Sequence, residues 1–521
     1  MKNLLAEKVK QRRTLFLIPY LLFGLFSLYF LGTSSHSVND FPLDDAWIHR
    51  VYARSLAWGQ GLSYNQGEPE TGATSPLWIL LSAPLHWLEP IWPDAPVVGV
   101  KVIGGMLGLL SIGLVLLIIR TLIGGIRIPL ITASIWAIEP RLIFSSYAGM
   151  EVNLFVVIFL GLIWADLTER KIGTYLFLSL LPVCRPEGLL VLLIYGLKDL
   201  FLWWTQGKRI HFIGWLWVAV PFSLWMIICQ RISGLVLPLP FYQKAQWVWP
   251  NFSHLLKMWQ LQSHHGPFPG LVFAAGILSF GFLCFQNRSF PAVKTFLPFV
   301  VVPAVFLLGI LLSRSISLDG YYWLRYADPA DLILMIAAII GLALWADRIG
   351  PWRVWIRKIP KGERHPLGFL KGNLPLLAGV LLVCSLPHWW QSIETKRFHL
   401  WSDGKIIHLM NVEVGKWLKV HTPPQVSVGV NDAGAIKYFS DRRIVDLLGL
   451  NNRDVVLKRV SVKDLFNRVD WIALYPVWFR KFNLKDFELR QVYSVNPETY
   501  SLCNCPTQTL LTIAERRKGV H

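Results

Sequence analysis

Charged side chains are scarce in this sequence. Only 16% of its 521 residues are Asp, Glu, Lys or Arg, whereas 54% are hydrophobic and the mean hydropathy is +0.44. A soluble chain of this length cannot bury so much apolar surface. The shortage of charge therefore excludes a soluble globular protein and predicts a multi-span membrane protein.

The sequence also shows no pattern typical of a disulfide framework or of a leader cleavage site. Four of the six cysteines lie within apolar segments, and Cys503 and Cys505 are too close together for an unstrained bridge. The apolar run from Thr14 to Leu31 is long enough to cross a bilayer, and no small-residue cleavage site follows it. We therefore expect a retained signal anchor with a cytoplasmic N-terminus.

Acids are fewer than bases, and the net charge is +19. Such a charge can indicate a nucleic-acid partner, but its distribution argues for a membrane instead. Residues 1–13 carry five Lys or Arg against one acid, and residues 347–372 carry seven against two. Basic loops of this kind face the cytoplasm. We expect the lipid bilayer, and no nucleic acid, as a partner.

Apolar runs predict about eleven transmembrane helices. Pro76 to Leu88 is apolar but short, and counting it as a crossing would move the basic 347–372 loop outside, so we assign it as non-crossing. The loops 32–96, 232–268 and 314–327 then lie on the exterior face. The predicted spans are 14–31, 97–119, 128–146, 150–167, 172–184, 187–204, 211–231, 269–286, 295–313, 328–346 and 373–390.

From residue 391 the composition becomes that of a soluble domain of about 130 residues. Val426 to Val430, Ile444 to Leu448 and Asp470 to Tyr475 read as strands, and the turn residues 431–434 follow the first of them. We predict a polytopic α-helical membrane domain over 1–390 and an extracytoplasmic α/β domain over 391–521. No internal repeat or low-complexity tract is visible.

Asp44 and Asp45 open a predicted surface helix over residues 45–58, in the first exterior loop. Trp47, Ile48 and Val51 belong to one apolar face, so the helix should lie in the membrane interface. Two adjacent carboxylates in a confined site repel each other, which suits them to proton removal or to sharing a cation. Acids that merely favour a helix N-terminus are the alternative.

The same loop resembles the first exterior loop of GT-C glycosyltransferases that use polyprenyl-phosphate sugars, similar to mycobacterial terminal arabinofuranosyltransferases. The matching stretch is DDAWIHRVYARSLAWGQGLSYNQGE, which ends at Glu68 and is followed by TSPLW. Two departures stand out: Gln66 replaces a proline, and Thr71 stands where a second acid is expected, with Glu70 one residue early. A role for that second acid is in doubt.

Weaker matches extend the resemblance over nearly the whole chain. They are Gly149-Met150-Glu151, Arg185-Pro186-Glu187-Gly188, the segment 237–244, Arg325-Tyr326 with Pro329, and the segments 432–434 and 446–450. The resemblance implies a GT-C fold of about eleven helices and a site of Asp44, Asp45, Glu68, Glu151, Arg185, Glu187, Tyr242, Lys244, Arg325 and Tyr326.

Several of these residues have a simpler explanation. Arg185 and Glu187 can form an internal ion pair, Lys244 can reach toward the membrane interface, and Glu151 can be a buried hydrogen-bonded acid. Asp432 reads as a turn residue after a strand rather than as a catalytic acid.

Asp44 or Asp45 with His49 can supply ligands for Mg²⁺ or Mn²⁺, although their spacing does not specify a site. His264 and His265 also raise the possibility of a metal.

The expected function is transfer of a pentose or hexose from a polyprenyl-phosphate donor to a glycan, lipid or protein acceptor of the cell envelope. The expected place is the exterior face of a bacterial cytoplasmic membrane. Asp44 would act as general base with inversion, while cations such as Lys244, Arg325 and Arg185 would neutralise the phosphate. A transporter or lipid flippase is the alternative, but it should show inverted repeats and charges within its spans.

Overall fold

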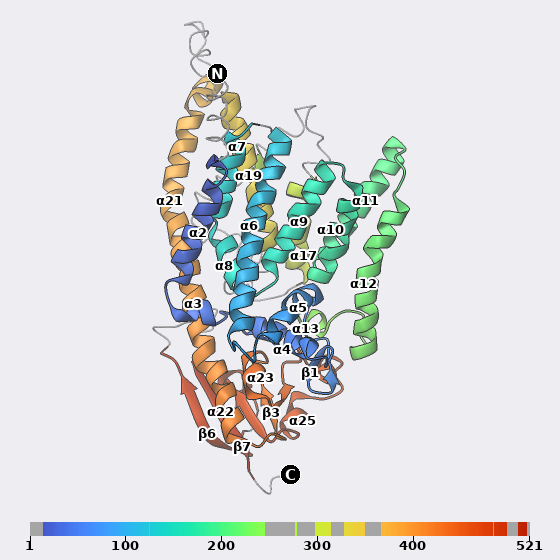
Figure 1. Cartoon of the computed structure of the whole chain (residues 1–521), viewed down its shortest axis with the longest axis vertical. Coiled ribbons are helices and arrows are strands. Elements are labelled where there is room, and N and C mark those ends of the chain that lie inside the picture. Colours follow the sequence, from blue (N-terminus) through green and yellow to red (C-terminus); the bar gives the residue numbers. More distant parts are fainter. Residues whose placement is uncertain are drawn as a thin grey trace.

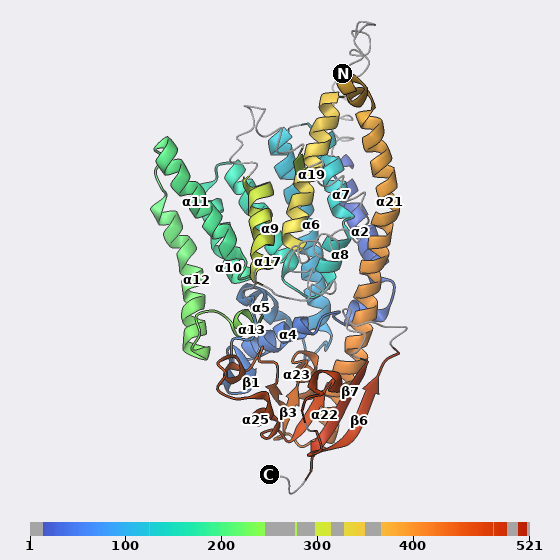
Figure 2. The same cartoon turned by 180° about the vertical axis from the view of Figure 1, so that it is seen from behind.

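The computed structural model describes residues 14–123, 125–244, 277–278, 297–313, 328–349, 366–482, 484–496 and 509–517. Long helices run side by side through one part of the molecule, and a smaller sheet domain closes the end opposite the N-terminus (Figure 1). A layer of short elements lies between them, as the view from behind also shows (Figure 2).

The helical part is built largely from segments that are apolar on all sides, as expected of helices that are buried or in contact with lipid. Its helices are α2 (Ile18–Leu31), α6 (Ala95–Ile123), α7 (Arg127–Ala137), α8 (Pro140–Tyr147), α9 (Val152–Leu167), α10 (Lys171–Cys184), α11 (Gly188–Gln206), α12 (Phe212–Ser233), α17 (Val302–Ser313), α19 (Asp328–Ile349) and α21 (Pro366–Ile407). A π-helical turn, η2 (Leu297–Val301), precedes α17.

Three helices in the described residues are long and apolar enough to cross a membrane: α6, α11 and α12. The pair α7 and α8 makes a fourth when counted as one span, bent by 53°. The break follows from Pro140, which cannot donate a backbone hydrogen bond within a continuous helix. The prediction of a helix-rich membrane protein is confirmed, whereas the expected number of eleven spans stays a prediction.

Most of the short elements between bundle and sheet come from residues 35–87, between α2 and α6. They are α3 (Ser35–Asn39), α4 (Asp44–Ala57), β1 (Ser63–Asn65), β2 (Glu68–Pro69), α5 (Pro76–Ser82) and the 3₁₀ helix η1 (Ala83–Trp87), joined by α13 (Leu239–Lys244). Residues 76–87 thus form two short helical pieces, and the expectation that this segment does not cross the membrane stays a prediction.

The tail domain, residues 408–517, carries a mixed five-stranded sheet in the order β4-β3-β5-β7-β6. Its strands are β3 (Ser427–Val430), β4 (Arg443–Asp446), β5 (Trp471–Leu474), β6 (Phe487–Ser494) and β7 (Leu510–Arg516). The first three pair in parallel and match the predicted strands, whereas β6 and β7 add an antiparallel edge.

Helical segments cover this sheet and join it to the bundle. They are the π-helical turn η4 (His408–Val412), α22 (Glu413–His421), α23 (Ala435–Ser440), α24 (Arg453–Val456), α25 (Val462–Phe466) and the 3₁₀ helix η5 (Pro476–Phe479). Helix α21 runs continuously to Ile407, so the predicted boundary at 390/391 falls inside a helix that links the two parts.

Candidate active site

Helix α4 lies crosswise between the bundle and the tail domain (Figure 1). It packs against α5, η1, β1 and α23, and its aromatic residues Trp47 and Tyr52 are each 1% exposed. The prediction of a surface helix is wrong, because its polar residues are buried as well as its apolar ones: His49 is 3% exposed and Arg50 is fully buried. His49 faces Glu151, Arg50 donates to Ser82 Oγ at 2.7 Å, and Trp47 packs against Tyr438 and Phe439 of the tail domain.

Asp44, the first residue of α4, is held by the tail domain. Its Oδ2 accepts a hydrogen bond from the backbone N–H of Gly434 at 2.7 Å, and its Oδ1 accepts one from Ala435 at 2.9 Å. Asn411 Nδ2 donates to the same Oδ1 at 3.2 Å. The first N–H groups of a helix have no acceptor within that helix, and the Asp44 carboxylate accepts hydrogen bonds from two such groups at the start of α23. Asp44 therefore joins the two parts of the protein.

A second partly buried acid, Asp432, lies beside this junction. Asn411 Nδ2 donates to its Oδ2 at 3.0 Å, and the Tyr475 hydroxyl in turn donates to Asn411 Oδ1 at 3.1 Å. Burial raises the pKa of Asp44 to about 6, and burial together with the nearby charge of Asp44 raises the pKa of Asp432 to about 8. Asp432 does follow a strand, as expected, but the assignment to a turn alone misses its position beside Asn411 and Asp44.

Asp45 points to a different partner. The ammonium of Lys244, on α13, lies 3.0 Å from Asp45 Oδ2, and the two side chains are 18% and 16% exposed. Asp45 and Lys244 are about 200 residues apart in the sequence. The structure thus brings together a carboxylate and a cation that the sequence analysis assigned to one site. Tyr242 precedes Lys244 on α13, is 39% exposed, and accepts a hydrogen bond from the Leu237 amide at 3.3 Å.

Arg185 forms a buried ion cluster at the ends of the bundle helices. Its Nη1 lies 3.0 Å from Glu151 Oε1 and its Nε lies 3.5 Å from Glu187 Oε2. His49 Nδ1, one turn beyond Asp45 on α4, lies 3.7 Å from Glu151 Oε2. The internal ion pair considered for Arg185 and Glu187 is therefore present, and His49 connects it to α4.

Gly149 helps to place Glu151. Its φ is +81°, and a Cβ would come within 2.5 Å of the Phe41 ring. Its carbonyl accepts a hydrogen bond from Trp78 Nε1 at 3.0 Å. Because only glycine fits this backbone conformation and space, the Gly149-Met150-Glu151 motif has a structural reason as well as a chemical one.

The remaining predicted residues lie elsewhere. Glu68 accepts a hydrogen bond from Arg443 Nε of β4 at 2.7 Å and another from Asn65 Nδ2 at 3.0 Å, so it contacts the tail domain. Arg325 and Tyr326 lie outside the described residues, as do His264 and His265. Their expected roles stay predictions.

The geometry of the expected metal ligands is divergent. Asp44 faces the amides of α23, Asp45 faces Lys244, and His49 faces Glu151. These three residues do not converge on one point, so the Mg²⁺ or Mn²⁺ ion expected there stays a prediction. In the described part of the chain, the ligand atoms of a different trio lie within 4.8 Å of one another: His36, Asp40 and His408.

Comparison with known proteins agrees with this architecture. The sequence model of a domain of unknown function, DUF8728, matches residues 403–513, which correspond closely to the tail domain. A comparison of the sequence with curated proteins gives no significant match.

Solved structures match nearly the whole chain. ArnT from Cupriavidus metallidurans in the apo state has a TM-score of 0.59 at 13% identity, over 95% of this chain and 97% of that one. ArnT bound to undecaprenyl phosphate gives 0.57 at 12% identity, over 96% and 98%. The Archaeoglobus fulgidus oligosaccharyltransferase gives 0.56 at 12% identity, over 88% of this chain and 69% of that one.

The chain therefore has the fold of the GT-C glycosyltransferases, membrane enzymes with polyprenyl-phosphate donors. This confirms the resemblance predicted from the Asp44 to Trp78 loop. At 12–13% identity the match shows the fold alone.

Proposed function

We propose that this protein is a membrane glycosyltransferase that moves one sugar from a polyprenyl-phosphate donor to an acceptor hydroxyl. The observation that carries the proposal is the pair of Asp45 and Lys244, 3.0 Å apart at the junction of bundle and tail domain. It places a proton acceptor beside a cation, which are the two groups that glycosyl transfer from a phosphate requires. The solved structure of ArnT with undecaprenyl phosphate supports this class of donor.

Asp45 suits the role of general base better than Asp44. The two oxygens of Asp44 accept three hydrogen bonds from the tail domain, so that carboxylate is already committed to joining the two parts. Asp45 has a side chain that is 16% exposed, and its counter-ion is a flexible lysine. We therefore assign proton removal to Asp45 and a positioning role to Asp44, in place of the base role expected for Asp44.

Lys244 would pair first with Asp45 and then with the donor phosphate. In the absence of substrate its ammonium neutralises Asp45, and a bound donor phosphate would compete for that ammonium. Transfer of the lysine contact to the phosphate would remove the positive charge of Lys244 from Asp45, which favours proton uptake by that carboxylate. Arg185 is held by Glu151 and Glu187, so its role is to fix the rim of the site. Arg325 would be a further phosphate-binding cation.

The proposed step balances without another reactant. Asp45 takes the proton of the acceptor hydroxyl as that oxygen attacks the anomeric carbon. The bond between the anomeric carbon and the phosphate oxygen breaks, and the polyprenyl phosphate leaves with its electron pair. Attack in line with the leaving group inverts the anomeric centre. No step passes through the Mg²⁺ or Mn²⁺ ion expected from the sequence.

The distribution of charge supports a site on the exterior face. The basic segments 1–13 and 347–372 favour the cytoplasm, and in that orientation the tail domain and the Asp45 site would lie on the exterior face of the cytoplasmic membrane. The acceptor would be a glycan, lipid or protein of the cell envelope, and the sugar a pentose or hexose.

Purified protein in proteoliposomes tests this function. A panel of radiolabelled polyprenyl-phosphate pentoses and hexoses is incubated with envelope extracts, and the label in product and in remaining donor is measured. Glycosyl transfer requires product with release of polyprenyl phosphate. Movement of intact donor across the bilayer with no new glycosidic bond would instead establish the transporter or flippase and contradict the proposal.

A further inference from the structure

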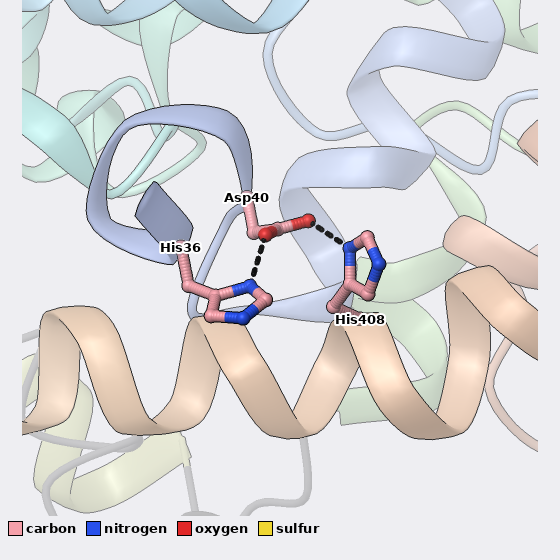
Figure 3. A group of neighbouring side chains, drawn as sticks. All are labelled: His36, Asp40 and His408. Carbon is pink, nitrogen blue, oxygen red and sulfur yellow. Dashed lines mark hydrogen bonds and ion pairs between the residues drawn. The ribbon is translucent and has the colours of Figure 1, made fainter. Parts of the chain in front are cut away.

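A second cluster of polar residues, which does not include Asp45 or Lys244, joins α3 and its C-terminal cap to the start of η4 (Figure 3). Asp40 stands between two imidazoles: its Oδ2 lies 2.7 Å from His36 Nδ1, and its Oδ1 lies 2.7 Å from His408 Nδ1. Asp40 is 3% exposed, and the ligand atoms of the three residues lie within 4.8 Å of one another. The glycosyl transfer proposed above has no use for this cluster.

The backbone around the cluster is firmly placed. His36 and Asp40 are one helical turn apart on α3 and its cap, and the Ser34 side chain caps the start of that helix. The buried ammonium of Lys101 donates to the carbonyl oxygens of Ser37 at 2.7 Å and of Asp40 at 2.6 Å. These bonds hold the backbone of α3 and its cap against α6.

The helix that carries His408 comes close to this segment because of a glycine. A Cβ on Gly404, one turn before His408, would lie only 3.1 Å from the His36 carbonyl oxygen. Gly404 therefore permits the approach of α21 that brings His408 opposite His36. The two imidazole centroids are 5.2 Å apart.

We propose that His36, Asp40 and His408 bind one divalent transition-metal ion of the zinc type. Two imidazoles and one carboxylate form a three-ligand set that Zn²⁺ accepts with water in the fourth position. His408 also has the outer partner that metal-bound histidines usually have, since its Nε2 lies 3.4 Å from Glu413 Oε1. On binding, each imidazole presents an unprotonated Nδ1 to the ion and keeps its proton on Nε2, so a histidine that is protonated beforehand releases one proton to solvent.

The ion would tie the tail domain to the membrane domain. His408 is the first residue of η4, and Asn411 in the same π-helical turn donates to both Asp44 and Asp432. A metal that fixes His408 to α3 would thus fix the turn from which Asn411 reaches α4. The role is structural, and it does not depend on the reaction proposed for Asp45.

Zinc binding by the full-length protein tests the inference. Protein without a polyhistidine tag is purified in detergent, stripped with EDTA, desalted and titrated with ZnCl₂. Zinc that remains after gel filtration is counted by mass spectrometry, and the Kd is measured by calorimetry. We expect one zinc ion per wild-type chain and none retained by His408→Gln.

Two further variants keep the test decisive. Glu413→Gln retains all three ligands and should weaken zinc binding by roughly 10- to 100-fold. His421→Gln, on an exposed histidine that stacks on Trp417, should bind zinc as the wild type does. A wild-type chain that retains no zinc, or equal binding by all variants, would show a hydrogen-bonded triad only and overturn the proposal.

Discussion

Replacing Asp432 with Asn should stabilise the contact between the tail domain and α4 at alkaline pH. Burial and the neighbouring Asp44 raise the pKa of Asp432 from 3.8 to about 8. Ionising Asp432 in its folded surroundings is therefore unfavourable, so the contact should weaken as Asp432 loses its proton. An asparagine resembles the protonated carboxyl in being uncharged, and its single oxygen can accept the hydrogen bond from Asn411 or the one from Asn431, which donate to the two oxygens of Asp432.

The direction in which the stability of the tail domain changes with pH follows from proton binding by Asp432. An acid whose pKa is raised on folding binds its proton more tightly in the folded state. Its contribution to stability is complete below pH 4 and is lost as the pH rises toward 8. The wild-type tail domain should therefore become less stable between pH 5 and pH 8, by at most about 1.4 kcal/mol per pH unit for one proton. Asp432→Asn should flatten much of this slope.

Hydrogen exchange of the α23 and β3 amides, measured on the full chain in detergent from pH 5 to pH 9, gives this opening free energy after correction for intrinsic exchange. Asp441→Asn, on a more exposed acid of the same domain, serves as the control and should keep the wild-type slope. A wild-type stability that is level or rises with pH, or a slope unchanged in Asp432→Asn, would refute the reasoning.

Three other predictions concern single contacts. Lys244→Met should raise the KM for the donor and lower kcat, by ~10-fold or more in kcat/KM, in the transfer assay; unchanged kinetics would remove Lys244 from the site. Gly434→Ala should weaken tail docking by roughly 1–3 kcal/mol in hydrogen exchange, because its Cβ would lie 2.2 Å from the Asp44 carbonyl, whereas Gly24→Ala, with open space around it, should be neutral. Arg185→Leu should destabilise the bundle by roughly 3 kcal/mol, since it strands the buried Glu151, and an unchanged thermal melting temperature would contradict this.

The elements that could be predicted are those with a local signal. Apolar runs indicated α6, α11 and α12, the acids before an apolar face marked the start of α4, and β-branched runs marked β3 to β5. Strands β6 and β7 were missed. In β6, only Phe487 is buried and most of the other side chains are exposed. The segment FELRQVYS therefore has too short an apolar pattern to distinguish it from a loop.

Other features depend on contacts between distant segments. Helix α21 was expected to end at 390 because polar residues follow, but the helix simply leaves the apolar region and continues to Ile407. The burial of Arg50 and the proximity of Asp44, Asn411 and Asp432 arise only when the tail domain docks on α4. The hydrophobic periodicity of a single segment cannot predict that the tail domain docks on α4. The resemblance found Asp45 and Lys244, whereas spacing alone could not pair them.

The central claim is that Asp45 removes the acceptor proton, and a comparison of three variants in the transfer assay tests it most directly. Asp45→Asn should lower kcat by roughly 10²- to 10⁴-fold while hydrogen exchange at the tail junction stays unchanged. Asp44→Asn should weaken that junction, and the exposed Asp94→Asn of the same loop should match the wild type in both measurements. Turnover by Asp45→Asn within a few fold of the wild type would contradict the account.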